Sequence, residues 1–549
     1  MHIVRSKFKA ASGKVYETIL LRESYREGKK VKKRTVANLT NCSQKELAAI
    51  ELALKHSKKP SESIFQGKPT ITEGLSVGGV WAVFQIAKRL GIVEALGNER
   101  HGQLALWQVI AKVLEQGSRL SAVRLAETYA IASVIELEKG FNEEDLYKNL
   151  FWLAENQADI EDKIFQKRLS APPSLFLYDV TSSYLEGEQN ELANWGYNRD
   201  GKKGKKQIVI GLMSAEDGTP VTAEVFKGNT QDTSTFASQV KKAKERFGCE
   251  KVTFVGDRGM IKSGQIETLQ KWGFHHITAI TKIQIESLLK NGIIHYELFD
   301  EKLVEVESNG LRYIIRRNPV RAKEIAHARV RKRTSIEDLV TRQNAYLFEH
   351  PKAQVETALK TVNAKIDRLK LREWLSVNVQ ERTLILSVDE DALVHEGKLD
   401  GCYVIKTDLI HNSISTEIIH ARYKDLAMVE SAFRTVKSDL ELRPIHVRKE
   451  TSTRGHVLVV MLAYMITREL DNAWKSLYLT VGEGLLSLST LTLLEVSHGD
   501  GMTYQEFPKP REQNRSMLEA IEVELPKILP INKAHVVTRK NRRNLNVKN

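Results

Sequence analysis

The stretch Tyr423–Leu440, YKDLAMVESAFRTVKSDL, decides how the chain is organised. Its apolar residues recur every three or four positions, which is the spacing of an amphipathic helix packed on a core. That stripe consists of Leu426, Val429, Phe433, Val436 and Leu440. Tyr423, Glu430 and Lys437 lie seven residues apart and therefore share a second face, at the border between core and solvent. We predict a single helix over 423–440.

Two interpretations of this helix stay open. A carboxylate flanked by a phenol, an ammonium and the guanidinium of Arg434 suits a metal-bound phosphate at the floor of a cleft. The alternative is an ordinary surface helix, in which Glu430 pairs with Arg434 one turn away. Two aspartates earlier in the chain favour the first interpretation.

The first of these, Asp179, follows the short apolar run Leu175–Leu177, and the second, Asp257, follows KVTFVG. We expect both aspartates at the ends of buried strands, where chemistry usually sits in open α/β sheets. Carboxylates suit hard ions such as Mg²⁺, and two such ions can clamp both oxygens of a phosphoryl displacement. The sequence therefore points to Asp179, Asp257 and Glu430 as catalytic residues and metal ligands, with two Mg²⁺ ions, for which Mn²⁺ substitutes.

Composition limits the partners. The chain has 549 residues, and its 83 Lys and Arg outnumber 69 Asp and Glu, which gives a net charge of +14. This excess favours a polyanion such as nucleic acid over a membrane. A basic enzyme without a nucleic-acid partner is the alternative.

The three cysteines lie far apart and show no metal-binding spacing. The N-terminus lacks the apolar core of a signal peptide, and the apolar run Val457–Ile466 is too short to span a bilayer. We expect a cytoplasmic protein without a membrane segment.

The pattern along the chain predicts an α/β protein of six segments. We expect a small basic β unit at 1–45, a helical region at 46–168 that carries the reader of DNA ends, and the first part of a mixed α/β core at 169–282. A β-rich insertion at 283–400, the second part of the core at 401–475, and a C-terminal helical region with a basic tail at 476–549 complete the chain.

Three blocks together resemble a known family. FLYDVTSSYLEG, TFVGDRGM, and DGCYVIKTDL followed by YKDLAMVESAFRTVK are similar to the catalytic blocks of DDE transposases. The resemblance is closest to the insertion-sequence-four class, which carries its third acid in a Tyr…Arg…Glu…Lys motif. Tyr423, Glu430 and Lys437 match that motif, but Leu426 stands where the class has its arginine.

The resemblance implies a ribonuclease H-like fold and cut-and-paste transposition of an insertion sequence. Asp179 would bridge the two Mg²⁺ ions, and Asp257 and Glu430 would each complete one of them. The partners would be double-stranded DNA, as terminal inverted repeats and target, and a second copy of the chain in a synaptic complex. Whether a hairpin intermediate releases the flanking DNA stays open.

Several basic and aromatic side chains are candidates for DNA contact. The loop Tyr197–Lys206, YNRDGKKGKK, is expected to meet phosphates rather than bases. The candidate DNA-binding residues are Tyr423, Lys437, Arg434, Lys202, Lys203, Lys205, Lys206 and Arg258. In the insertion, Arg316, Arg317, Arg321, Arg329, Arg331 and Lys332 are candidates for contact with DNA or with the partner subunit.

Two rival functions remain. One is a metal-dependent nuclease of the same fold that cuts DNA without joining it. The other is a DNA-binding repressor whose acids are idle, although the intact set of three carboxylates counts against it.

Overall fold

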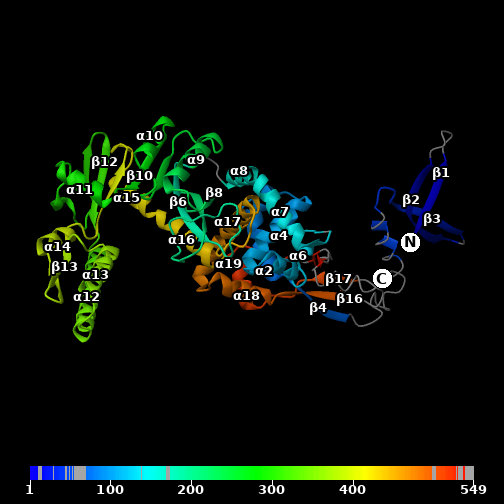
Figure 1. Ribbon diagram of the computed structural model, residues 1–549. Coiled ribbons are helices and arrows are strands. Elements are labelled where there is room, and N and C mark those ends of the chain that lie inside the picture. Colours follow the sequence, from blue (N-terminus) through cyan, green and yellow to red (C-terminus); the bar gives the residue numbers. More distant parts are fainter. Residues whose placement is uncertain are drawn as a thin grey trace.

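The computed structural model describes residues 1–9, 15–28, 30–43, 46–47, 50–51, 54, 70–137, 139–168, 173–497, 503–526, 528–529 and 536–537. Figure 1 shows an elongated molecule with the N-terminal sheet at one end, a helical region in the middle and a large sheet at the other end. Most of the predicted basic tail lies outside the described residues. None of the helices described could cross a membrane.

An eight-stranded mixed sheet confirms the predicted α/β core. Its strand order is β11-β12-β15-β10-β9-β6-β7-β8, in which β9 is parallel to β6 and β10 and the other neighbours are antiparallel. The strands are β6 (Leu175–Tyr184), β7 (Gln207–Ala215), β8 (Pro220–Phe226), β9 (Thr253–Gly256), β10 (His275–Ala279), β11 (Val304–Ser308), β12 (Leu311–Arg317) and β15 (Cys402–Thr407).

Helices cover both faces of this sheet. Leu175 and Leu177 of β6 belong to a hydrophobic cluster with α16 (Leu426–Ser438) and α17 (Glu450–Trp474). Phe176 and Tyr178 point the other way and pack with α9 (Asp232–Glu245) and α10 (Ser263–Lys271). Burial on both faces explains why this strand reads as a continuous apolar run.

The prediction that this strand ends on Asp179 is wrong. β6 continues to Tyr184, because β7 pairs with it along its whole length, as far as Tyr184 opposite Gln207. The strand propensity of Val180, Thr181 and Tyr184 is consistent with this continuation.

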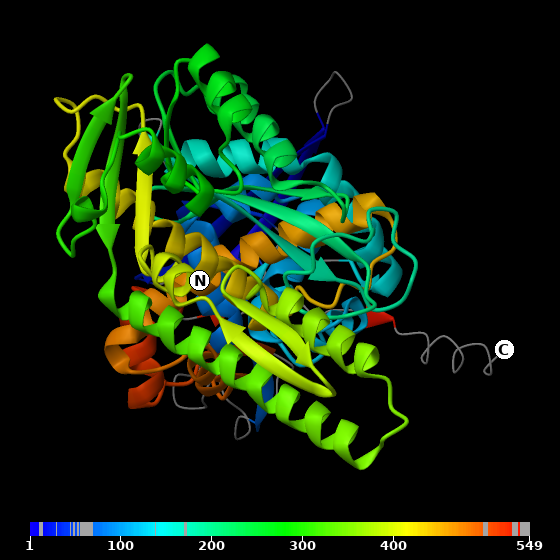
Figure 2. The ribbon, with the colours of Figure 1, turned by 60° about the vertical axis from the view of Figure 1, so that its left-hand side comes forward.

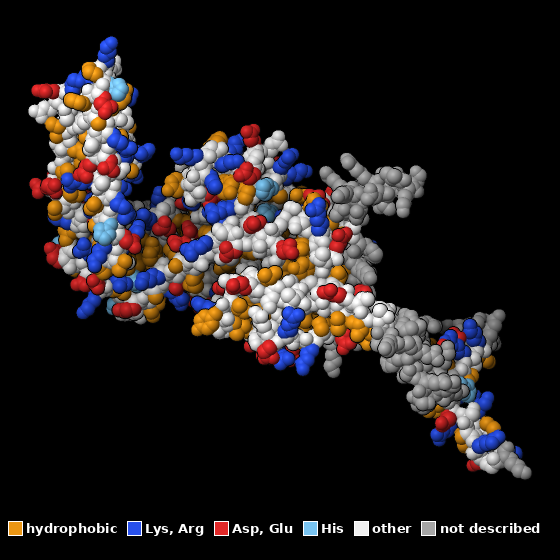
Figure 3. All heavy atoms as spheres, turned by 90° about the horizontal axis from the view of Figure 1, so that it is seen from below, with side chains coloured by type: hydrophobic (Ala, Val, Ile, Leu, Met, Phe, Trp, Pro, Cys, Tyr) orange, Lys and Arg blue, Asp and Glu red, His pale blue; other side chains and the backbone are white. Residues whose placement is uncertain are grey.

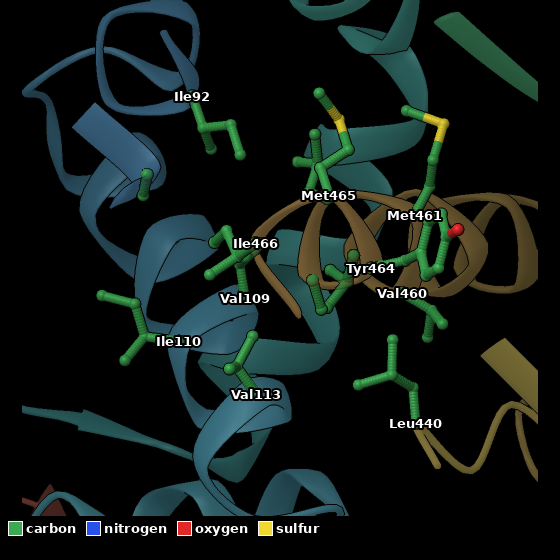
Figure 4. Close-up of a cluster of buried hydrophobic side chains, with 14 of the residues drawn as sticks. Ile92, Val109, Ile110, Val113, Leu440, Val460, Met461, Tyr464, Met465 and Ile466 are labelled. Carbon is green, nitrogen blue, oxygen red and sulfur yellow. The ribbon is translucent and has the colours of Figure 1, made fainter. Parts of the chain in front are cut away.

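The helical region is part of the same core. It consists of α2 (Gly78–Arg89), α3 (Ile92–Leu96), α4 (Arg100–Leu114), α5 (Arg119–Leu125), α6 (Ile131–Val134), α7 (Glu143–Glu155) and α8 (Gln157–Arg168). The side chains of α17 interleave with those of α4 in Figure 4. At Gly455 of α17, an added Cβ would lie 2.0 Å from the carbonyl oxygen of Leu150, so α7 and α17 touch backbone to backbone. The expected N-cap of α7 is confirmed, since Asn142 accepts a bond from the N–H of Asp145.

The C-terminal region is not only helical, as we had expected. Besides α18 (Val481–Ser489) and α19 (Glu512–Ala520), it contributes β16 (Thr492–Ser497), β17 (Thr503–Glu506) and β18 (Ile528–Leu529) to a second sheet. β16 pairs with β4 (Thr70–Ser76), so this small sheet joins segments from the two halves of the chain.

The prediction of a β-rich insertion over 283–400 is wrong. α11 (Lys282–Lys290) and strands β11 and β12 belong to the main sheet, because β12 pairs with β15 across the interruption. What remains is mostly helical: α12 (Pro319–Glu349), α13 (Val355–Leu369), the hairpin β13 (Leu375–Gln380) with β14 (Thr383–Val388), and α14 (Glu390–Gly397). α12 begins where Asn318 caps the helix and Pro319 occupies its first turn.

We call residues 319–397 the arm. It has a hydrophobic core of its own, which includes Ile336, Val362 and Trp374. In Figure 2, α12 runs across the front of the molecule, and in Figure 3 the arm stands away from the body across a deep notch.

The stretch 423–440 is not one helix, although its apolar stripe is confirmed. α15 (Thr416–Lys424) ends and α16 begins at Asp425, whose backbone N–H bonds the carbonyl of Ala421. All five residues of the stripe are buried. Tyr423 therefore belongs to a different helix from Glu430.

Candidate active site

Strand pairing sets the two aspartates side by side. In the parallel pair β6 and β9, Tyr178 lies opposite Gly256, so Asp179 and Asp257 are the next residues on neighbouring strands. Asp179 shares the face of β6 with Leu177, and that face is covered by α16. The sequence expectation that the two acids meet is confirmed for the backbone positions.

Glu430 reaches the same region from above the sheet. It is exposed on α16, which packs against β6. Burial raises the pKa of the Asp179 carboxyl to about 7, and the negative charges of Asp257 and Glu430 add to this effect. The N–H of Val180 and the charge of Arg199 oppose the rise. The three carboxylates are therefore electrostatic neighbours.

No cation neutralises these acids within the described parts of the chain. Asp179 Oδ1 accepts the N–H of Val180 at 2.8 Å, and Asp257 Oδ1 accepts the N–H of Arg258 at 2.7 Å. The Glu430–Arg434 pair of the alternative interpretation is absent from the ion pairs between described residues. A set of carboxylates without cationic partners suits a hard divalent ion.

The three acids have not closed into a finished metal site. Across the described residues, no three His, Cys, Asp or Glu side chains are arranged closely enough to hold an ion. The two aspartates sit on the rigid sheet, whereas Glu430 has a longer, exposed side chain. Completing the donor set would thus fall mainly to Glu430.

A cleft opens beside Asp257. Its volume is about 540 Å³, and Arg258, Tyr403, Tyr423 and Lys424 are among the residues that line it. Burial and the nearby charge of Asp257 raise the pKa of the Tyr423 phenol, so this group stays protonated. The structure thus places two of the candidate DNA-binding residues, Tyr423 and Arg258, at one opening next to the acids.

Lys437 does not point at open space, contrary to what the motif suggested. It is buried, and its ammonium donates to Asp200 Oδ1 at 2.8 Å. Arg443 donates to the same oxygen at 3.0 Å, and the N–H of Tyr184 donates to Oδ2 at 3.2 Å. We call Lys437, Asp200 and Arg443 the buried triad. It fixes the loop that contains Asp200 to the end of α16.

That loop, residues 197–206, is called the basic loop below. Lys203 is exposed, Lys202 lies 5.7 Å from the ring centroid of Tyr184, and Lys205 pairs with Glu186 at 2.9 Å. Lys206 is half-buried. The loop also holds Arg199, which is paired with Asp232 and lowers the pKa of Asp179.

Sequence reasoning missed the roles of Arg199 and Asp200. The only local sign was an Arg-Asp pair inside a Gly- and Lys-rich turn. Both residues act through partners that are remote in sequence, as Asp200 does with Lys437, 237 positions away.

Comparison with known protein families gives the identity. A family model described as "Transposase DDE domain" matches residues 170–466, more than half of the chain. The chain belongs to the DDE transposases. The model "IS1634 family transposase, N-terminal domain" also matches residues 3–68, so the two matches support an IS1634-family transposase. DDE transposases are DNA-processing enzymes, and their catalytic domains generally use divalent metal ions.

Other comparisons of the transposase are distant. No curated protein matches it. A piggyBac transposase synaptic complex with hairpin DNA has a TM-score of 0.36 and 8% identity, and the likeness covers 83% of this chain and 82% of that one. A Mos1 transposase paired-end complex has a TM-score of 0.15 and 12% identity, over 43% of this chain and 68% of that one.

Proposed function

We propose that this transposase cuts the ends of an insertion sequence and joins them to target DNA, with Asp179, Asp257 and Glu430 as its catalytic carboxylates. The observation that supports this is the parallel pairing of β6 and β9 beneath α16, which brings three acids without cationic partners to one place. The proposal includes membership of the insertion-sequence-four class, on the match of Tyr423, Glu430 and Lys437 to its motif.

Mg²⁺, or Mn²⁺ in its place, is the proposed cofactor. Asp179 lies between the other two acids and would bridge two ions, while Asp257 and Glu430 would each hold one. When bound, the ions would stabilise the charge that develops on the phosphate and lower the pKa of the attacking hydroxyl or water.

The protein's own groups would position DNA. Arg258 and Tyr423 line the cleft beside Asp257, so a phosphate there would meet a guanidinium and a phenol. Arg434 is exposed one turn beyond Glu430. The role we propose for Lys437 is to keep Asp200 and the basic loop in place, and a phosphate contact would require it to leave Asp200.

The arm would form the far wall of the DNA channel or meet the partner subunit. Figure 3 shows Lys and Arg side chains on the side of the arm that faces the notch. Not all of the candidate arginines are available: Arg329 is bound to Asp400 by two bonds, of 2.6 and 2.9 Å. Arg331 is exposed and has no ion pair with any other described residue, so it is the better candidate.

A strand-transfer assay tests this function. A labelled duplex with a pre-cut terminal repeat, taken from the DNA that flanks the gene, is incubated with plasmid and Mg²⁺. We expect joined products from the wild-type chain and none from Asp179→Asn, while a gel shift in Ca²⁺ shows equal DNA binding by both. Cutting without joining would make the protein a nuclease, and binding without either reaction would make it a repressor.

A further inference from the structure

The N-terminal sheet has two chemically different faces. It consists of β1 (His2–Lys9), β2 (Val15–Glu27) and β3 (Lys30–Asn38), in the order β1-β2-β3. Cross-strand partners share a face, and the register places Ile3 opposite Leu21 and Leu21 opposite Ala37. These residues pack with Leu47 and Ile50, so we call this side the covered face.

All three glutamates of the sheet lie on the covered face. They alternate with it along β2 and are matched by cations of the neighbouring strands. The pairs are Glu17 with Lys7, Glu23 with Arg34, and Glu27 with Lys32. The charges on this face are therefore largely compensated within the sheet.

The opposite side, which we call the open face, has cations but no acid on its described strand residues. Arg22, Arg26 and Lys33 project there, and none of them has an ion pair with another described residue. Arg26 and Lys33 are exposed, and Arg22 is half-buried. Between them the face carries short hydrogen-bonding side chains: His2, Ser6, Thr18, Ser24 and Thr35.

We propose that the open face binds double-stranded DNA in the major groove, an inference that rests on the proposed function. Three strands spaced by about 4.8 Å place the outer strand axes about 10 Å apart, and the major groove is about 12 Å wide. The central strand would bring Arg22 and Arg26 towards base edges. Lys33, on an outer strand, would follow a phosphate wall.

Charge decides between DNA and the other occupants of such a face. A second copy of the same face would bring uncompensated arginines together, and like charges in an interface disfavour association. A large apolar partner is also disfavoured, because cations and hydroxyls interrupt the apolar positions. A polyanion compensates all three cations at once.

The test compares two triple variants of the full-length chain. Arg22→Gln, Arg26→Gln and Lys33→Gln neutralise the open face. Lys7→Gln, Lys30→Gln and Lys32→Gln remove the same charge from the covered side of the same sheet. The probe is a 40-bp duplex of mixed sequence in EDTA, titrated by fluorescence anisotropy at several salt concentrations.

We expect the slope of log K against log salt to become shallower by about 2 to 3 for the open-face variant, since each lost phosphate contact changes it by about 0.9. The covered-face variant should stay close to the wild-type slope. Equal slopes for the two variants would overturn the inference, as would unprotected guanine N7 atoms in methylation footprints of the wild-type complex. The pair Arg26→Gln and Lys33→Gln, both exposed, repeats the test if the triple variant misfolds.

Because no metal is present, this binding test is independent of catalysis. Strand transfer with unchanged slopes would remove the open face and keep the proposed function. Altered slopes without strand transfer would do the reverse.

Discussion

Replacing Asp200 by Asn should destabilise the fold more than a surface change would. The side chain of Asp200 is 3% exposed and that of Lys437 is 10% exposed, so the ion pair between them is shielded from water. Asn keeps the size of Asp but removes the charge that compensates the buried ammonium. Breaking a buried pair by removing one partner costs about 3–5 kcal/mol.

Arg443 reduces this cost only in part. Its side chain is 33% exposed, so water can solvate it when Asp200 is neutral. Burial already lowers the pKa of Lys437, and its bond to Asp200 opposes that shift. Removing the carboxylate should therefore lower the pKa of Lys437 further, and stability lost by Asp200→Asn should partly return as pH rises and this lysine deprotonates.

A double-mutant cycle measures the coupling directly. Asp200→Asn, Lys437→Met and the double variant are compared by thermal unfolding at pH 7, with Arg434→Met as the surface control on the same helix. We expect the double variant to lose much less than the sum of the two single losses, because neither charge remains unpaired. Additive losses, or a melting temperature of Asp200→Asn equal to that of the wild type, would refute the buried triad.

Three further outcomes are expected. Arg312, Thr416 and His411 hold the pKa of Glu305 at about 2, so this carboxylate stabilises the protein above pH 4.5 and the gain is lost as pH falls towards 2; Glu305→Gln should therefore be less stable than wild type at pH 6 and approach it at pH 2.5 in urea titrations, and a constant difference would contradict this. Changing Lys202, Lys203, Lys205 and Lys206 to Gln should weaken binding to all DNA sequences alike and flatten the salt dependence; weaker binding to the terminal repeat alone, in the same anisotropy assay, would contradict it. Arg329→Met should lower the melting temperature by breaking its bonds to Asp400, whereas Arg331→Met should leave it unchanged and weaken DNA binding or self-association; the opposite pattern would exchange their roles.

Local patterns sufficed for the parts of the fold that burial dictates. The apolar run before Asp179 identified a strand buried on both faces, and the stripe from Leu426 to Leu440 identified the helix face that packs on the core. Both patterns arise from residues that are neighbours in sequence, and they placed the two aspartates on adjacent strands before any pairing was known.

Long-range pairing explains what the sequence did not show. β12 looks like part of an insertion because its partner β15 comes only after the arm. Lys437 looks like a free phosphate ligand because its partner, Asp200, lies in a remote loop. Side-chain partners of this kind depend on the assembled fold and leave no local pattern.

The central claim is that Asp179, Asp257 and Glu430 act together, and Glu430 tests it most directly because it is exposed and has no partner among the described residues. The measurement is single-turnover cleavage of a labelled terminal-repeat duplex in Mg²⁺ by Glu430→Gln, beside a gel shift in Ca²⁺. Loss of a direct metal ligand should lower the rate by more than the about 10–100-fold that outer-shell partners cost, with DNA binding unchanged. Cleavage by Glu430→Gln within a few-fold of the wild-type rate would contradict the account and return α16 to an ordinary surface helix.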